Sequence, residues 1–254
     1  MRHYRWLVSV VLVCGGCGAS PEEQPGWQPV MVRAESQPAL GYLDVSGSLI
    51  VPWCAAVLIS PKLVVTAAHC VGDFAPSHVT FGVGRITPDG AEGGSYRVRD
   101  IVLHPDRALW QHNLAALILE EPVRGVWPVR LGEGGVPDGR LTSVTYEFVV
   151  RGHAGERRVW AGQAQGKNDP ITLVPTEGQP NCHADAGTGA IDAGGNVLGF
   201  LSAGAQEKDP DHNRGGVYDG VPGCYQSYKL AAVAQNLPFI DHAMSLAGRP
   251  IVVP

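Results

Sequence analysis

The sequence lacks several features that would assign a function directly. Of its 254 residues only 7% are aromatic and 17% are charged, and the net charge of −5 is spread over interspersed acidic and basic residues. There is no basic stripe to follow a phosphate backbone, so we expect no nucleic-acid partner. An acidic tail and internal repeats are also missing. The hydrophobic content of 44% suffices for one large domain or two small ones.

Long segments with a helical period are few, whereas glycine (33) and proline (20) are abundant. This composition favours a turn-rich β protein over a helical bundle or a βαβ array. Residues 228–248 carry a partial helical period that stops at Gly248. Many short strands before one terminal helix predict an all-β barrel or a pair of barrels. The predicted strands are residues 40–47, 54–60, 63–68, 79–86, 96–103, 114–120, 141–150, 157–164, 171–175 and 197–204.

The apolar run near the N-terminus, WLVSVVLVC, is too short to span a bilayer. It follows Arg2 and Arg5 and precedes the small residues GGCGAS, so residues 1–19 are predicted to be an export leader. Two processing routes fit. Gly16 and Cys17 resemble a bacterial lipobox, which would make Cys17 a lipid anchor, and cleavage after Ala19 is the alternative. Both predict export, to the bacterial cell envelope or the medium, with residues 20–30 as an irregular arm or tether.

The predicted export determines how the cysteines are interpreted, because disulfides form in oxidising compartments. The mature chain keeps an even number of them, which predicts disulfides in an oxidising compartment. Four cysteines allow three connectivities, and a bridge between the first two would close a loop of 16 residues. The mature chain has no CxxC-like cluster of the kind that forms a zinc site, so we expect no metal and no cofactor. The four are Cys54, Cys70, Cys182 and Cys224.

Residues 54–70, CAAVLISPKLVVTAAHC, resemble the segment that delivers the catalytic histidine in trypsin/chymotrypsin-like serine peptidases. The resemblance implies two packed six-stranded Greek-key β-barrels with a C-terminal helix, formed by residues 31–247 and followed by a tail at 248–254. It makes His69 the general base, fixed at the mouth of the cleft by a cysteine bridge. We also expect a monomer.

The second landmark of this family is an aspartate that opens a buried strand after a His-Pro turn. Here HPDRALWQHNLAALILEEPV places Asn113 at that position, 44 residues after His69. A carboxylate in this role fixes the imidazole tautomer and stabilises the imidazolium, and a neutral amide does neither well. Asp106 could replace it only if its loop bent inward.

The third landmark, the nucleophile motif C-x-G-D-S-G-G-P, corresponds to CHADAGTGAI at residues 182–191. The alignment puts Ala186 at the nucleophile and Ala184 at the glycine whose N–H contributes to the oxyanion hole. A methyl group cannot attack a carbonyl. Thr188 lies two residues beyond the required position, so we do not expect it to act as the nucleophile.

Other positions preserve the outline of a cleft. Ser202 and Gly204 match the strand that lies beside the substrate backbone, and Cys224 matches the disulfide partner of Cys182. Pro180 falls near the position that carries an aspartate in enzymes cutting after Lys or Arg, so no preference for basic residues is implied.

These features predict an exported, catalytically inactive homologue of the serine peptidases that binds a peptide or protein ligand through its cleft or loops. The alternative is an active serine endopeptidase with a displaced catalytic group. A third possibility is a structural envelope component without a ligand.

Overall fold

The computed structural model describes most of the chain after residue 37. Its two units are Met1–Met31 and Val32–Pro254, and all described residues belong to the second. The predicted leader, the arm and Cys17 therefore lie outside the described residues. The described residues are 38–45, 54–84, 86–87, 90–132, 134–136, 139–146, 157–166, 171–176, 181–182, 186–205, 217–218, 221–222, 224–225 and 227–248.

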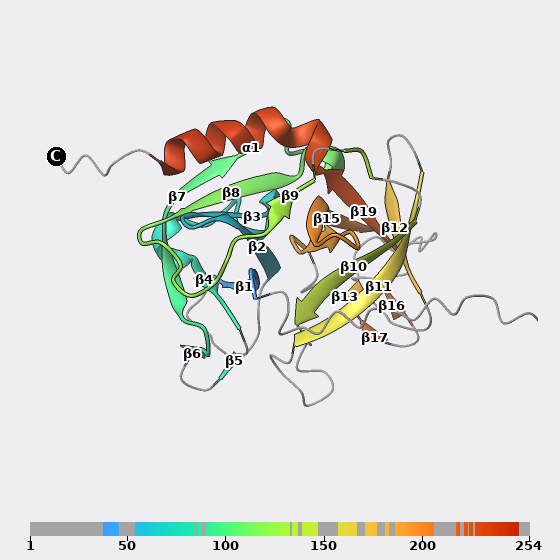
Figure 1. Ribbon diagram of the computed structural model, residues 1–254, viewed down its shortest axis with the longest axis horizontal. Coiled ribbons are helices and arrows are strands. Elements are labelled where there is room, and N and C mark those ends of the chain that lie inside the picture. Colours follow the sequence, from blue (N-terminus) through green and yellow to red (C-terminus); the bar gives the residue numbers. More distant parts are fainter. Residues whose placement is uncertain are drawn as a thin grey trace, which may run out of the picture. The chain divides into compact units, whose positions relative to one another are not determined.

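The first half of the second unit forms a closed, antiparallel six-stranded barrel with the strand order β1-β2-β3-β8-β7-β4 (Figure 1). Its core is filled by buried side chains from every strand, including Leu43, Leu58, Phe81 and Leu117. The strands are β1 Leu40–Asp44, β2 Cys54–Ser60, β3 Leu63–Ala67, β4 Thr80–Gly82, β7 Ser95–Leu103 and β8 Leu114–Leu119, with a small hairpin of β5 Ile86–Thr87 and β6 Gly90–Ala91. Three short 3-10 helices follow β3, precede β4 and precede β8: η2 Ala68–Cys70, η3 Pro76–His78 and η4 Trp110–His112.

A second six-stranded barrel follows in the order β14-β10-β11-β12-β19-β15 and is closed by the pairing of β14 with β15. A short strand, β9, extends it by parallel pairing with β15. The strands are β9 Arg130–Leu131, β10 Gly139–Tyr146, β11 Arg157–Gln165, β12 Thr172–Pro175, β14 Gly189–Ile191, β15 Asn196–Ala205 and β19 Ser227–Ala232. Separate two-stranded sheets pair β13 Asn181–Cys182 with β18 Cys224–Tyr225, and β16 Val217–Tyr218 with β17 Val221–Pro222.

The C-terminal helix α1, Val233–Ala247, packs on strands of both barrels (Figure 1). Its Phe239, Ile240 and Ala243 join a core cluster with residues of β3, β8 and β15. The expected helical segment was too long at its start, because Tyr228–Ala232 belongs to β19 and pairs with β15. Two barrels and a C-terminal helix confirm the predicted fold class. In the described part of the chain, no helix has the length and hydropathy needed to cross a membrane.

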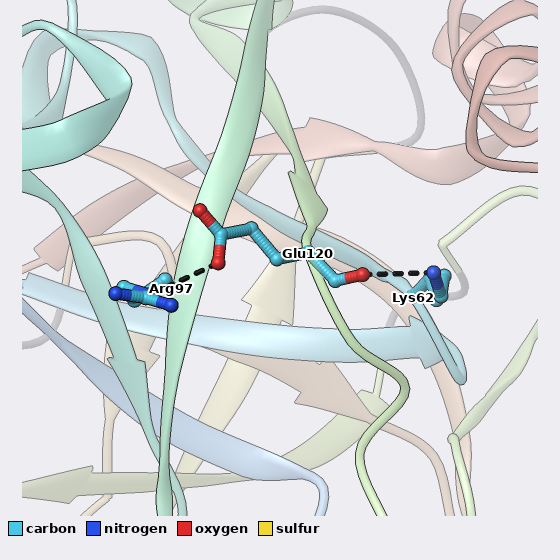
Figure 2. Close-up of polar contacts among 3 residues, drawn as sticks. All are labelled: Lys62, Arg97 and Glu120. Carbon is cyan, nitrogen blue, oxygen red and sulfur yellow. Dashed lines mark hydrogen bonds and ion pairs between the residues drawn. The ribbon is translucent and has the colours of Figure 1, made fainter. Parts of the chain in front are cut away.

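Polar contacts on the surface of the first barrel join three of its segments (Figure 2). The Arg97 Nε donates to Glu120 Oε2 at 2.9 Å, and Lys62 Nζ donates to the Glu120 carbonyl at 2.8 Å. Because the Arg97 and Glu120 side chains are 79% and 41% exposed, this ion pair contributes at most about 1 kcal/mol to stability. The buried barrel core, and not these contacts, positions the site described next.

Candidate functional site

His69 is held at the end of a disulfide-bonded hairpin. The strands β2 and β3 pair around the Ser-Pro turn, and a disulfide joins Cys54 at the start of β2 to Cys70 in η2, with 6.1 Å between the Cα atoms. Both cysteines are buried, whereas His69 is exposed. The prediction of disulfides is thus confirmed for this pair. The hairpin and its bridge fix the backbone of His69 while leaving its ring accessible.

Asn113 reaches His69 because β3 and β8 are neighbours. Ala67 pairs with Leu114, so the residues immediately beyond this pair, Asn113 and Ala68, meet through a backbone hydrogen bond of 3.0 Å. The Asn113 Oδ1 accepts the backbone N–H of His69 at 3.1 Å. Its Nδ2 lies 2.8 Å from His69 Nδ1 and donates to the Ser202 carbonyl at 3.0 Å.

These partners fix the orientation of the Asn113 amide. If the amide were flipped, Nδ2 would face the backbone N–H of His69 and Oδ1 would face the Ser202 carbonyl, so two hydrogen bonds would become like-with-like contacts. With Nδ2 as the donor, His69 Nδ1 has to be the acceptor. The neutral imidazole then carries its proton on Nε2.

This tautomer is the opposite of the one that a general base requires. A base in this position needs an unprotonated Nε2 to take the proton of a nucleophile. Here Nε2–H is a donor, and it lies 3.7 Å from Cys70 Sγ, a weak acceptor. The amide of Asn113 therefore positions the ring of His69 but opposes its use as a base.

Ala186 lies against the same hairpin. Its carbonyl accepts the N–H of Ala55 at 2.9 Å, and its side chain belongs to the core cluster that contains Ala68 and Cys70. The next residue, Gly187, has φ +86°, and a Cβ there would come within 2.3 Å of Ala55 O and Thr66 Oγ1. This close approach requires glycine. The structure thus brings Ala186 beside the histidine segment with a methyl as its side chain.

We next asked whether another described side chain could replace the missing nucleophile or the missing acid. Thr66 Oγ1 donates to the Ala55 carbonyl at 2.8 Å, and Ser202 Oγ donates to the Trp110 carbonyl. Thr188 is 0% exposed, so a substrate cannot reach its hydroxyl. Asp106, the considered substitute for the acid, is exposed in the turn after β7, where its N–H donates to His104 Nδ1 at 3.1 Å.

Ser202 occupies an irregular point in β15. The β15–β19 register passes from Leu201 paired with Leu230 to Ala203 paired with Lys229, so Ser202 is the extra residue of a bulge. Bulges redirect backbone groups near functional sites. The bulge frees the Ser202 carbonyl for Asn113, and the strand continues through Gly204 as the expected edge of the cleft.

The family model that describes trypsin matches residues 28–226, which is more than half of the chain. This chain belongs to the trypsin family. That His69, Asn113 and Ala186 correspond to the histidine, aspartate and serine of this family remains the prediction made from the sequence motifs.

Two curated proteins similar to this chain are named as a protease and a trypsin. A vitellin-degrading protease of Bombyx mori is 36% identical over 99 residues, and the match covers 36% of this chain but only 37% of that protein. A trypsin of Saccharopolyspora erythraea is 27% identical over 194 residues, covering 68% of this chain and 84% of that protein.

Among solved structures, the scabies mite inactivated protease paralogue S-D1 has a TM-score of 0.62 at 17% identity, covering 86% of this chain and 97% of that one. Kallikrein-related peptidase 10 in complex with Zn²⁺ has a TM-score of 0.62 at 20% identity, covering 84% and 98%. At these identities the likeness concerns the trypsin fold alone.

No metal chemistry follows from the described cluster of potential ligands. Atoms of Cys54, His69 and Cys70 lie within 4.8 Å of one another, but the two sulfurs are bonded to each other. Disulfide sulfurs lack the thiolate charge that binds metal ions. Of the other expected positions in the cleft, Pro180 and Ala184 lie outside the described residues.

The second cysteine pair of the trypsin-like domain is placed by its backbone. Cys182 in β13 lies directly opposite Cys224 in β18. Directly paired residues of antiparallel strands have Cα atoms about 4.5–5.5 Å apart, within the range that a disulfide spans. We therefore predict that peptide mapping without reduction yields a cross-linked peptide containing these two residues. Recovery of both as free thiols from protein folded under oxidising conditions would contradict the prediction.

Two polar residues that were not predicted from the sequence, Asn236 and Lys229, contact the 3-10 helix η4 just before Asn113. Asn236 of α1 is completely buried, and its Nδ2 donates to the carbonyls of Gln111 and Ala232 at 3.0 and 2.8 Å. Lys229 of β19 places Nζ 5.1 Å from the centre of a Trp110 ring. No local motif predicts the contacts of Asn236 with Gln111 and of Lys229 with Trp110, because each joins segments more than a hundred residues apart.

Proposed function

We propose that this chain is an exported trypsin-family protein that does not cleave peptide bonds and that binds a peptide or protein segment in its cleft. The observation that carries this proposal is the Asn113 amide, which donates to His69 Nδ1 at 2.8 Å while a methyl group stands at Ala186. The nucleophile is missing and the tautomer is wrong. Loss of either alone reduces catalysis in this family by several orders of magnitude.

Retention of the scaffold supports a binding role. The disulfide, the hydrogen bonds of the half-buried Asn113 and the Ser202 bulge hold the exposed His69 near strand β15. An extended peptide can bind along such a strand through backbone hydrogen bonds. The similar structure named as an inactivated protease paralogue indicates that this fold persists without catalysis.

A serine-directed fluorophosphonate tests the absence of catalysis. We expect no covalent attachment to the purified protein under conditions that label an active trypsin completely, because no hydroxyl stands at position 186. Intact-mass spectrometry reads the result. Stoichiometric attachment that denaturation abolishes would establish the alternative, an active endopeptidase with a displaced nucleophile.

Peptide selection tests binding in the cleft. Peptides enriched from a displayed random library should bind His69→Ala at least about fivefold more weakly, the equivalent of about 1 kcal/mol at an interface position. The matched control is His78→Ala, since His78 is also exposed but lies in η3. Equal binding by both variants would place the ligand elsewhere, and a library that yields no binder would favour a purely structural component.

A further inference from the structure

A pair of stacked histidines joins the loop that carries Asn113 to the C-terminal helix. His104 follows β7 and His112 ends η4, and their rings lie 4.7 Å apart and 5° from parallel. His104 is 7% exposed, and its ring contacts the ring of Phe239 in α1 at 4.9 Å. Neither imidazole has a part in the site described above.

Hydrogen bonds assign one proton to each ring. The Asp106 N–H donates to His104 Nδ1 at 3.1 Å, so that nitrogen is unprotonated. The Oδ1 of Asn236 lies 2.9 Å from His112 Nδ1. Because both hydrogens of Asn236 Nδ2 are directed at backbone carbonyls, Oδ1 is the atom that faces His112, and His112 Nδ1–H donates to it.

The two rings respond differently to acid. His112 can gain its second proton on Nε2 and keep its bond to Asn236. His104 can gain one only on Nδ1, where the Asp106 N–H already points, so protonation breaks that hydrogen bond. Two protonated rings in a parallel stack would also repel each other.

We propose that the stacked pair of His104 and His112 is an acid-sensitive contact that fastens residues 104–113 to α1 at neutral pH and releases them in acid. The released segment contains Trp110, whose carbonyl accepts Ser202 Oγ. It ends at Asn113, which binds both His69 and Ser202. Acid would therefore weaken the hydrogen bonds by which Trp110 and Asn113 hold Ser202 at the expected edge of the cleft. This goes beyond the proposed function, because it does not depend on what the cleft binds.

The surrounding groups favour the neutral state of His104. Burial lowers the pKa of His104, the neighbouring His112 lowers this pKa further, and Asp106 partly opposes both. Two residues of α1 contact the histidine pair: Phe239 contacts His104 and Asn236 contacts His112, and neither residue titrates. Lys229 of β19 places its charge over Trp110 in the same segment. Since the unfolded chain binds the proton from about pH 6.5 downward, the contact's contribution to stability is complete above that pH and declines below it.

Hydrogen exchange at pH 7.5 and 5.0 tests the release. The amides of Arg107, Leu109 and His112 donate within this segment. After correction for the intrinsic pH dependence of exchange, their protection should fall at least about fivefold in acid, the effect of one lost hydrogen bond. Protection of the amides in β3 and β8 should stay unchanged, which separates local release from global unfolding.

The decisive variant is His104→Asn, whose amide oxygen can accept the Asp106 N–H but cannot gain a proton. It should show equal protection of residues 105–113 at both pH values, whereas the control His78→Asn should lose protection as the unsubstituted protein does. Acid-induced loss that persists in His104→Asn would overturn the proposal.

If His104→Asn fails to fold, an NMR titration of the histidines in the unsubstituted protein tests whether protonation of His104 releases the segment. The shift changes of amides 105–113 should share their midpoint with His104. Midpoints that differ, or amides that do not respond while His104 titrates, would overturn the proposal. Neither arm uses a cleft ligand or a fluorophosphonate, so failure of the proposed function would leave these results unaffected.

Discussion

Replacing Cys54 and Cys70 together by alanine is expected to lower the free energy of unfolding by about 3 kcal/mol. The bridge spans 16 residues, and cross-linking a loop of this length removes that amount of conformational freedom from the unfolded chain. Both positions are buried, which is why alanine, and not serine, is the appropriate replacement: a serine hydroxyl would have to be buried there. For a domain of this size the thermal midpoint should fall by about 6–12 °C.

Chemical denaturation, followed by far-ultraviolet circular dichroism, measures this effect. A useful control is Cys182→Ala with Cys224→Ala, which removes the other predicted bridge and leaves the hairpin of β2 and β3 intact. That control should destabilise the second barrel without changing the accessibility of His69. A loss below about 1 kcal/mol for the first pair would mean that core packing alone holds the hairpin and that the bridge is dispensable.

The segments around His69 and Asn113 were predictable because their sequence signals are local. The strands β2 and β3 begin and end within one residue of the prediction, since a Ser-Pro turn separates two apolar runs and the cysteines flank them. The strand predicted at 114–120 is confirmed as β8, Leu114–Leu119, which Asn113 directly precedes. In each case the signal lies within about 20 residues, so it needs no knowledge of the tertiary structure.

What the sequence left open depends on partners that are distant in the chain. The amide orientation of Asn113 is decided by the backbone N–H of His69 and the Ser202 carbonyl, which are 44 and 89 residues away. The apolar segment Tyr228–Ala232 fits a helix or a strand, and pairing with β15 decides for the strand. The roles of His104, His112 and Asn236 follow from contacts between the loop before β8 and α1.

The largest expected effect comes from restoring two groups of the trypsin site together. Ala186→Ser with Asn113→Asp should react with a fluorophosphonate about 10⁴-fold faster than Ala186→Ser alone. In the single variant His69 Nε2 already carries a proton, so it cannot accept one from the new hydroxyl. A carboxylate at position 113 would instead accept from Nδ1–H, which leaves Nε2 unprotonated and able to act as the base.

The substitution Asn113→Asp should lower the free energy of unfolding while it raises reactivity. This conflict between stability and reactivity is our explanation for the amide at position 113. A carboxylate oxygen in place of Asn113 Nδ2 would face the Ser202 carbonyl, now 3.0 Å away and hydrogen-bonded, so Asn113→Asp should lose about 1–3 kcal/mol of unfolding free energy. The control is Asn113→Asp alone, which has no nucleophile. Its nitrogen chemical shifts should place the His69 proton on Nδ1, and the fluorophosphonate should not attach to it. If His69 already carries that proton on Nδ1 in the unsubstituted protein, or if Ala186→Ser alone reacts as fast as the pair, the amide does not control the imidazole. The expected results would instead mean that the Asn113 amide, which stabilises the fold by donating to the Ser202 carbonyl and to His69 Nδ1, also keeps the imidazole proton on Nε2.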